Sequence, residues 1–329
     1  MLRLFLIPIG VSVVIFAAVG WLSGIHALVL TLFLTALEVS LSFDNAVVNA
    51  KVLSRMNARW QKRFLTWGML IAVFGARIIF PVLLVSLAAS ISPLALLQLL
   101  AFDSASYARL VEQAAPTIHA LGGAFLLMVA LKYFFDEAKS VHWIGFIEQR
   151  LVVWGRVQAI ETALALAVLL FFAWLLPAQA AMILGAGCIG IVLFVLMEGV
   201  VDVLGASANP TLKGGFGLFV YLNLLDAAFS FDGVVGAFAL TTNLLIIVIG
   251  LGVGAYFVRT FTIALVRQGT LASLVYLEHG AYWAIAGLSM CMFAGLVVEV
   301  PDAVAASISL GCIGAAYLSS RNVHMRETA

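Results

Sequence analysis

Apolar residues form long blocks along the chain, and short polar stretches separate them. A helix needs roughly 20 apolar residues to cross a hydrocarbon core about 30 Å thick. Nine or ten blocks approach that length, and they cover residues 4–22, 25–50, 66–91, 116–135, 158–176, 180–204, 214–240, 243–266, 278–298 and 303–319. Barrel strands would instead alternate over about ten residues. The pattern therefore predicts an all-α polytopic membrane protein with about 9–10 transmembrane helices.

Composition agrees with this pattern. Hydrophobic residues make up 64% of the 329 residues and charged residues only 10%, whereas an ordinary soluble domain is about 25% charged. We expect a single transmembrane domain over residues 1–329, and we expect the first block to remain as a helix rather than to act as a cleaved signal peptide. Residues 92–115 favour either a surface or re-entrant helix that forms a lid, or a plain loop. Residues 136–156 favour an interfacial helix.

Basic residues gather on one side of the predicted membrane. With alternating spans, that side receives Arg3, Lys51, Arg55, Arg59, Lys62, Arg63, Lys132, Lys139, Arg150, Arg156, Lys213, Arg267, Arg321 and Arg326. Only Arg109 falls on the other side. The positive-inside rule then makes the crowded side and both termini cytoplasmic. The basic run at 51–63 is a topological signal, so we expect no nucleic-acid partner.

Motifs of soluble enzymes do not occur in the chain. Its cysteines, Cys188, Cys291 and Cys312, lie in apolar blocks without metal-site spacing. There is no glycine-rich phosphate loop, nucleophile elbow or His-Glu-x-x-His sequence. We therefore expect neither an enzyme nor a bound cofactor. His279 lies near a helix end, where a satisfied polar side chain is expected rather than a metal ligand.

An acidic motif occurs twice. Glu38, Ser42, Phe43 and Asp44 recur at an offset of 188 residues as Asp226, Ser230, Phe231 and Asp232. In the following blocks, Gly68 and Arg77 match Gly250 and Arg259, and residues 121–131 weakly match 278–288. These matches predict two three-helix repeats, at about 31–135 and about 214–298. Additional helices are expected at about 4–22, 158–204 and 303–319. The loop charges orient the two motif helices oppositely, and inverted repeats are typical of secondary transporters.

The motif acids are costly inside a membrane. A carboxylate at mid-membrane costs about 2.5–3.5 kcal/mol on insertion scales, so such residues are retained for function or are partnered. In a regular helix Glu38, Ser42, Asn45 and Asn49 share one face, because they step by four, three and four. Asp44 is turned by about 120° from Glu38. Both acids of a motif can face one cavity only if the helix unwinds near Ser42–Asn45, and likewise near Ser230–Gly233.

Carboxylates, amides and hydroxyls form an oxygen ligand set, which suits Mn²⁺, Ca²⁺ or Mg²⁺. The predicted cation ligands are Glu38, Ser42, Asp44, Asn45, Asp226, Ser230 and Asp232, with Asn49 and Asn223 as secondary candidates. Arg77 and Arg259 are their expected charge partners. Alternatively, the acids only pair with these arginines and tie the repeats together. Both interpretations can hold, because two arginines against four carboxylates leave a formal charge of −2.

The paired motifs, each with an arginine in the following helix, resemble the TerC/Alx integral membrane family. The stretch "YLEHGAYWAI" from Tyr276 resembles a bacterial branch of that family, and the resemblance covers roughly Thr31–Phe135 and Gly214–Val298. It implies export of manganese, sometimes calcium. By this resemblance the cation ligands are Glu38, Asp44, Asn45, Asp226 and Asp232. The chain departs at Gly233, where the family more often has a serine, and in its additional helices.

We therefore expect a secondary transporter of a bacterial inner membrane that exports a divalent cation, foremost Mn²⁺, by alternating access. Its expected partners are the metal ion, as substrate, and the lipid bilayer. The coupling ion and the oligomeric state have no signal in the sequence. The alternatives are a membrane scaffold or assembly factor that does not transport, and an exporter of a small organic cation or amino acid.

Overall fold

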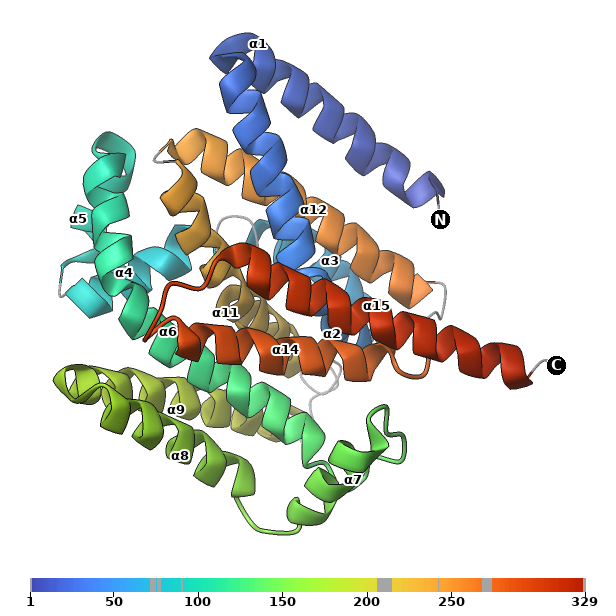
Figure 1. Cartoon of the computed structure of the whole chain (residues 1–329). Coiled ribbons are helices and arrows are strands. Elements are labelled where there is room, and N and C mark those ends of the chain that lie inside the picture. The colour runs from blue at the N-terminus through green and yellow to red at the C-terminus, as the bar shows by residue number, and fades with distance from the viewer. Residues whose placement is uncertain are drawn as a thin grey trace. The chain divides into compact units, whose positions relative to one another are not determined.

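The computed structural model describes residues 2–71, 75, 78–89, 91–205, 215–241, 243–267 and 274–327, and these residues contain no β-strand. The helices are α1 (Leu2–Leu41), α2 (Phe43–Ser54), α3 (Ala58–Leu70), α4 (Phe80–Ala89), α5 (Pro93–Phe102), α6 (Ser104–Phe134), α7 (Gly145–Trp154), α8 (Ile160–Leu175), α9 (Ala180–Gly205), α11 (Phe216–Leu240), α12 (Leu244–Arg267), α14 (Leu277–Ala294) and α15 (Asp302–Glu327), with a 3₁₀ turn at Pro177–Gln179 (Figure 1). The protein is an all-α polytopic membrane protein, as predicted.

Within the described residues, five helices are long and apolar enough to cross a membrane. They are Leu4–Leu41, Ser104–Phe134, Pro177–Val203, Leu244–Arg267 and Asp302–Val323. α1 is bent at Gly24, whose φ of 86° and ψ of 174° are not helical, and Figure 1 shows the two halves diverging from this point. Glycine adopts a positive φ at little cost because it has no Cβ. The bend separates the first two predicted spans, 4–22 and 25–50.

The stretch at 92–115 is helical, so the loop alternative is wrong. Ser92 caps α5 by accepting a hydrogen bond from the Ala95 N–H at 3.3 Å. Asp103 follows the end of α5, and its Oδ1 accepts a hydrogen bond from the Ser106 N–H at 3.1 Å. Asp103 thereby caps the start of α6. These caps satisfy backbone donors at the start of each helix. The predicted interfacial segment likewise contains a helix, α7, on which Phe146 and Trp154 are exposed.

The chain forms two compact units. The first contains residues 1–115 and 208–268, and the second contains residues 116–207 and 269–329. The first two helical segments of each predicted repeat lie in the first unit. The third helices, α6 from Pro116 onward and α14, lie in the second unit and pack together, with the Ser289 hydroxyl donating to the Gly123 carbonyl at 2.8 Å. Each unit therefore contains matching helices from both predicted repeats. The boundaries of the repeats themselves stay a prediction.

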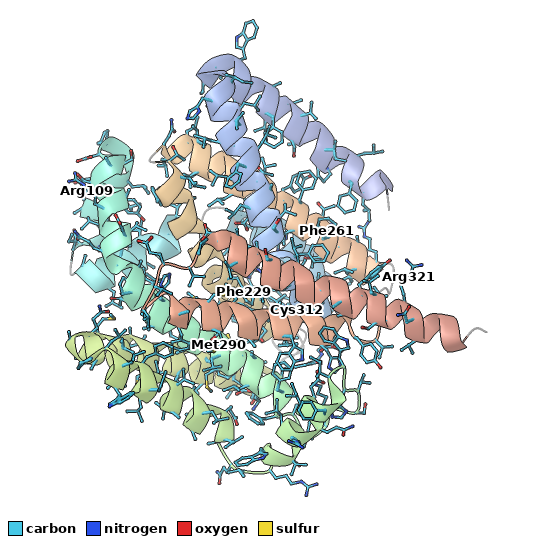
Figure 2. The ribbon with its side chains drawn as sticks, viewed as in Figure 1. Arg109, Phe229, Phe261, Met290, Cys312 and Arg321 are labelled. Carbon is cyan, nitrogen blue, oxygen red and sulfur yellow. The ribbon has the colours of Figure 1, made fainter. Side chains whose placement is uncertain are left out.

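Close packing of α1 against α12 positions the first acidic residue. A Cβ at Gly250 would lie 2.7 Å from the Leu34 Cβ, and one at Gly254 would lie 2.6 Å from the Glu38 Cβ. The Thr35 hydroxyl donates to the Gly250 carbonyl at 3.0 Å. Glycines four residues apart let two membrane helices approach this closely. Farther along α12 lies Phe261, which is labelled in Figure 2. Its ring centre lies 5.0 Å from that of Phe5 and 5.1 Å from that of Phe43.

Substituting Gly254 by Ala is expected to destabilise the first unit by about 1–3 kcal/mol, because the added methyl group overpacks the α1–α12 contact. Thermal unfolding followed by circular dichroism in one detergent measures this effect. Gly311→Ala is the matched control, since a Cβ at Gly311 meets nothing within 4 Å. Equal unfolding temperatures for the two variants would show that the glycine contact is not tight.

Candidate ion-binding site

A small, partly open cavity lies in the first unit, among α1, α2, α3, α11 and α12. Its walls are Glu38, Ser42, Asn45, Asn49, Phe64, Asp226, Ala255, Val258, Arg259 and Thr262. The first acidic motif and the acid that begins the second motif therefore meet in one space. The polar atoms of its walls are carboxylates, amides and hydroxyls, together with one guanidinium.

The residues of the first motif that line the cavity are those that helical spacing places on one face. Glu38, Ser42, Asn45 and Asn49 all line the cavity, as the step of four, three and four residues predicts. Asp44 is buried as well, with 1% of its surface exposed, but it is not among the described residues that line the cavity. Its Oδ1 accepts a hydrogen bond from the Asn45 N–H at 2.9 Å.

The predicted helix breaks are only partly present. Ser42 separates α1 from α2, with φ −103° and ψ 13°, yet hydrogen bonds from the Ser42 N–H to Glu38 and from the Ala46 N–H to Ser42 bridge this residue at 3.0 and 3.2 Å. The break is therefore too slight to turn Asp44 into the cavity. In the second motif the prediction is wrong, because α11 runs unbroken from Phe216 to Leu240. Apolar surroundings offer few other partners to backbone groups, so the helix keeps its own hydrogen bonds.

Glu38 and Asp226 are held by polar partners from the first motif. Glu38 is 2% exposed, and its Oε1 accepts a hydrogen bond from the Ser42 hydroxyl at 2.8 Å. The Asn49 side-chain amide donates to Asp226 Oδ1 at 2.6 Å and so connects the two motifs. Asn223, the other secondary candidate, donates to the Phe219 carbonyl at 2.6 Å and is not among the described lining residues.

Arg259 supplies the positive charge of the cavity wall. It is 6% exposed, and its Nη2 donates a hydrogen bond to the Phe64 carbonyl. Its guanidinium carbon lies 3.9 Å from the centre of the Phe64 ring. Among the described lining side chains, two carboxylates thus face one guanidinium. The predicted charge partner Arg259 is therefore in the same cavity as Glu38 and Asp226.

Several predicted site residues cannot be placed. Arg77 lies outside the described residues, and the side chains of Ser230 and Asp232 also lie outside them, although their backbone belongs to α11. In the part of the chain that is described, no three His, Cys, Asp or Glu side chains gather closely enough to hold a metal ion. Any cation held by the described walls would therefore rely on amide and hydroxyl oxygens as well as on carboxylates.

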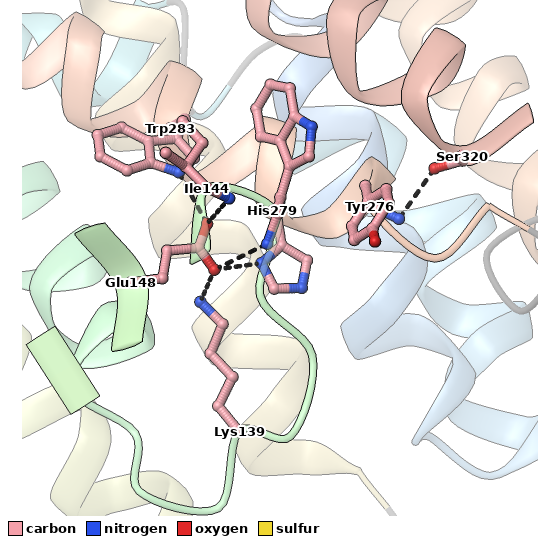
Figure 3. Close-up of polar contacts among 8 residues, drawn as sticks. Lys139, Ile144, Glu148, Tyr276, His279, Trp283 and Ser320 are labelled. Atoms are coloured by element: carbon pink, nitrogen blue, oxygen red, sulfur yellow. Dashed lines mark hydrogen bonds and ion pairs between the residues drawn. The ribbon is translucent and has the colours of Figure 1, made fainter. Parts of the chain in front are cut away.

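A buried carboxylate that the sequence did not reveal lies in the second unit (Figure 3). Glu148 of α7 has a fully buried side chain. Its Oε2 lies 2.9 Å from both Lys139 Nζ and His279 Nδ1, and its Oε1 accepts a hydrogen bond from Trp283 Nε1 at 3.0 Å. Backbone N–H groups of Trp143 and Ile144 also donate to it. His279 is thus a satisfied polar residue, as expected.

This network sets the charge of Glu148. Burial alone raises the pKa of a carboxyl group, but the hydrogen bonds from His279 and Trp283 and the Lys139 ammonium outweigh it. The pKa of Glu148 is therefore held well below its usual range, and the residue is ionised. Because its partners come from the segment before α7 and from α14, Glu148 fastens these two parts of the unit together.

Comparison with known proteins assigns the chain to a family. No curated protein and no solved structure matches the sequence. The family described as "Protein of unknown function (DUF475)" matches residues 43–327. This range includes α2 to α15, the Glu148 network and the walls of the cavity apart from Glu38 and Ser42, which precede it. The match covers well over half of the sequence, and the chain belongs to the DUF475 family.

Proposed function

We propose that this protein is a secondary transporter that exports a divalent metal cation, foremost Mn²⁺, from the cytoplasm, with the cavity as its binding site. The observation that carries the proposal is the meeting of Glu38 and Asp226, one acid from each motif, in a single cavity with hydroxyl and amide oxygens. Oxygen ligands of this kind suit hard divalent ions. Paired motifs from two repeats are also where such transporters bind their substrates.

Charge balance supports a divalent ion. The acids Glu38, Asp44, Asp226 and Asp232 together with Arg77 and Arg259 carry a formal charge of −2 when all are ionised. One divalent cation neutralises that charge, so binding removes the cost of uncompensated charge within the membrane. Without the cation, protonation of an acid would serve the same purpose.

Export requires a second ion. Moving a 2+ ion out against an inside-negative potential costs about 4.6 kcal/mol per 100 mV, twice the value for a single charge. The basic loops place both termini on the cytoplasmic side under this proposal. Entry of protons through the same acids would supply the energy, because each acid that releases the metal can accept a proton.

Arg259 favours one other substrate class. A guanidinium that lines the same cavity as two carboxylates can bind the carboxylate of a zwitterion while the acids bind its ammonium group. A small amino acid is therefore the second candidate. Its export would require no metal, so the two candidates predict different cargo.

Total metal content of cells with and without the protein, under manganese load, tests the proposal. We expect less manganese in cells that contain the protein, and no such decrease when Glu38 is replaced by Gln. A change in calcium or magnesium instead would correct the identity of the ion. Unchanged metal content together with increased release of an amino acid would favour the second candidate, and no change in either would favour a scaffold.

A further inference from the structure

Helix α3 forms a cradle around the Arg259 guanidinium. The Phe64 carbonyl accepts its hydrogen bond, and the Phe64 ring lies beneath it, 3.9 Å from the guanidinium carbon to the ring centre. One turn further along α3, a Cβ at Gly68 would lie only 2.5 Å from Arg259 Nη2. A carbonyl, an aromatic face and a bare stretch of backbone thus surround one guanidinium. We call this arrangement the Arg259 cradle.

Packing fixes the ring of the cradle. Phe64 is 1% exposed, and it belongs to a buried apolar cluster that contains Val52, Leu53, Met56, Trp60, Phe64 and Leu222. Its ring centre lies 6.3 Å from that of Phe219 in an edge-to-face arrangement, with an interplanar angle of 88°. A buried ring packed in such a cluster cannot follow the guanidinium if the guanidinium moves. The position of the charge is therefore set by the cluster.

At the position that matches Phe64, the sequence of the second repeat has no aromatic residue. The same offset of 182 residues that matches Gly68 to Gly250 makes Ile246 the counterpart of Phe64 in the sequence. Gly250 packs against Leu34 and the carbonyl of Thr31, which brings α1 close to α12. The two matched glycines thus have different neighbours, Arg259 at Gly68 and α1 at Gly250, and the residue that matches Phe64 is aliphatic.

We propose that Phe64 is a positioning residue, which acts through Arg259 by fixing this guanidinium in the cavity wall. A cation over an aromatic face at a desolvated site is stabilised by about 1–2 kcal/mol. Without the ring, the guanidinium moves further toward Glu38 and Asp226, where it competes with an incoming cation. The consequence for cation affinity rests on the proposed function, whereas the cradle itself does not.

Chemical modification of Arg259 in metal-free protein tests the cradle directly. The full-length protein is treated with phenylglyoxal, and mass spectrometry follows the rate at Arg259, with the exposed Arg109 as an internal reference. Phe64→Leu keeps an apolar side chain but removes the ring, so we expect modification about 5- to 30-fold faster. Phe64→Tyr keeps the ring and should react within about twofold of the wild type.

Gly68→Ala provides an independent variant, because its methyl group would lie only 2.5 Å from Arg259 Nη2 and would displace it. We expect it to accelerate modification of Arg259 as Phe64→Leu does, with Arg109 unchanged. An unchanged rate in Phe64→Leu, or an equal increase in Phe64→Tyr, would overturn the proposal. Because no metal is present in this experiment, its outcome does not depend on whether the protein transports cations.

A Mn²⁺ titration of the same purified proteins tests the consequence for affinity. We expect Phe64→Leu to bind Mn²⁺ about 5- to 30-fold more weakly than the wild type, and Phe64→Tyr to bind it normally. Normal Mn²⁺ affinity in Phe64→Leu would refute the positioning role while leaving the transport proposal intact. A wild-type protein that binds no Mn²⁺ would refute the proposed function alone.

Discussion

Replacing Glu38 by Gln is expected to lower Mn²⁺ transport by about 100-fold in vesicles that contain the purified protein. The substitution keeps the size of the side chain and an oxygen that can accept the hydrogen bond from the Ser42 hydroxyl. It removes one of the two described carboxylates of the cavity. Losing one member of a desolvated charge pair costs about 2–5 kcal/mol, and each 1.4 kcal/mol corresponds to a tenfold change in binding. Uptake of radioactive Mn²⁺ measures the effect.

Glu112→Gln is the matched control for this experiment. Glu112 is an exposed carboxylate on α6 in the same unit and does not line the cavity, so its loss should leave transport unchanged. Wild-type transport in Glu38→Gln would show that the cavity is not the ion site. A Glu38→Gln protein that fails to fold while the control folds would instead support the alternative in which the acids lock the repeats together.

Replacing Glu148 by Gln is expected to lower the free energy of unfolding by about 3–5 kcal/mol. The side chain of Lys139 is only 7% exposed, and the substitution removes the charge that compensates it. Breaking a buried ion pair on one side leaves an uncompensated charge, which is more costly than removing both partners. Thermal unfolding in detergent measures the loss. Glu299→Gln, at an exposed position, is the control and should unfold like the wild type.

Glu148 also predicts how stability depends on pH. Its pKa in the folded protein lies below the usual 4.5, so the unfolded chain binds a proton more readily than the folded one. The stabilisation is therefore complete above about pH 5 and decreases as the pH falls below the usual pKa. We expect the wild type to lose more stability than Glu148→Gln between about pH 6 and pH 4. Parallel losses in the two proteins would show that this carboxylate does not control the acid response.

Much of the fold follows from local features of the sequence. Apolar blocks predict the long helices because a chain in lipid must satisfy its own backbone hydrogen bonds. The bend at Gly24 falls in the gap between the blocks 4–22 and 25–50. The shared face of Glu38, Ser42, Asn45 and Asn49 follows from helical spacing alone. These features depend on neighbours within a few turns, so one sequence is sufficient to predict them.

Other features depend on partners that are distant in the chain. The residues at Ser230–Gly233 have weak helix propensity, which predicts a break, but the surroundings of α11 keep the helix intact. Glu148 resembles a solvated acid of an interfacial helix, and its burial depends on His279 and Trp283, more than 100 residues away. The Arg259 cradle likewise depends on contacts between α3 and α12. No spacing rule connects such residues.

Equilibrium dialysis with radioactive Mn²⁺ tests the central claim most directly. It compares the purified wild type with a double variant in which Glu38 is replaced by Gln and Asp226 by Asn, after circular dichroism has shown that both are folded. The proposed cavity predicts saturable Mn²⁺ binding by the wild type and loss of that binding in the double variant. Equal Mn²⁺ binding by the two proteins would contradict it.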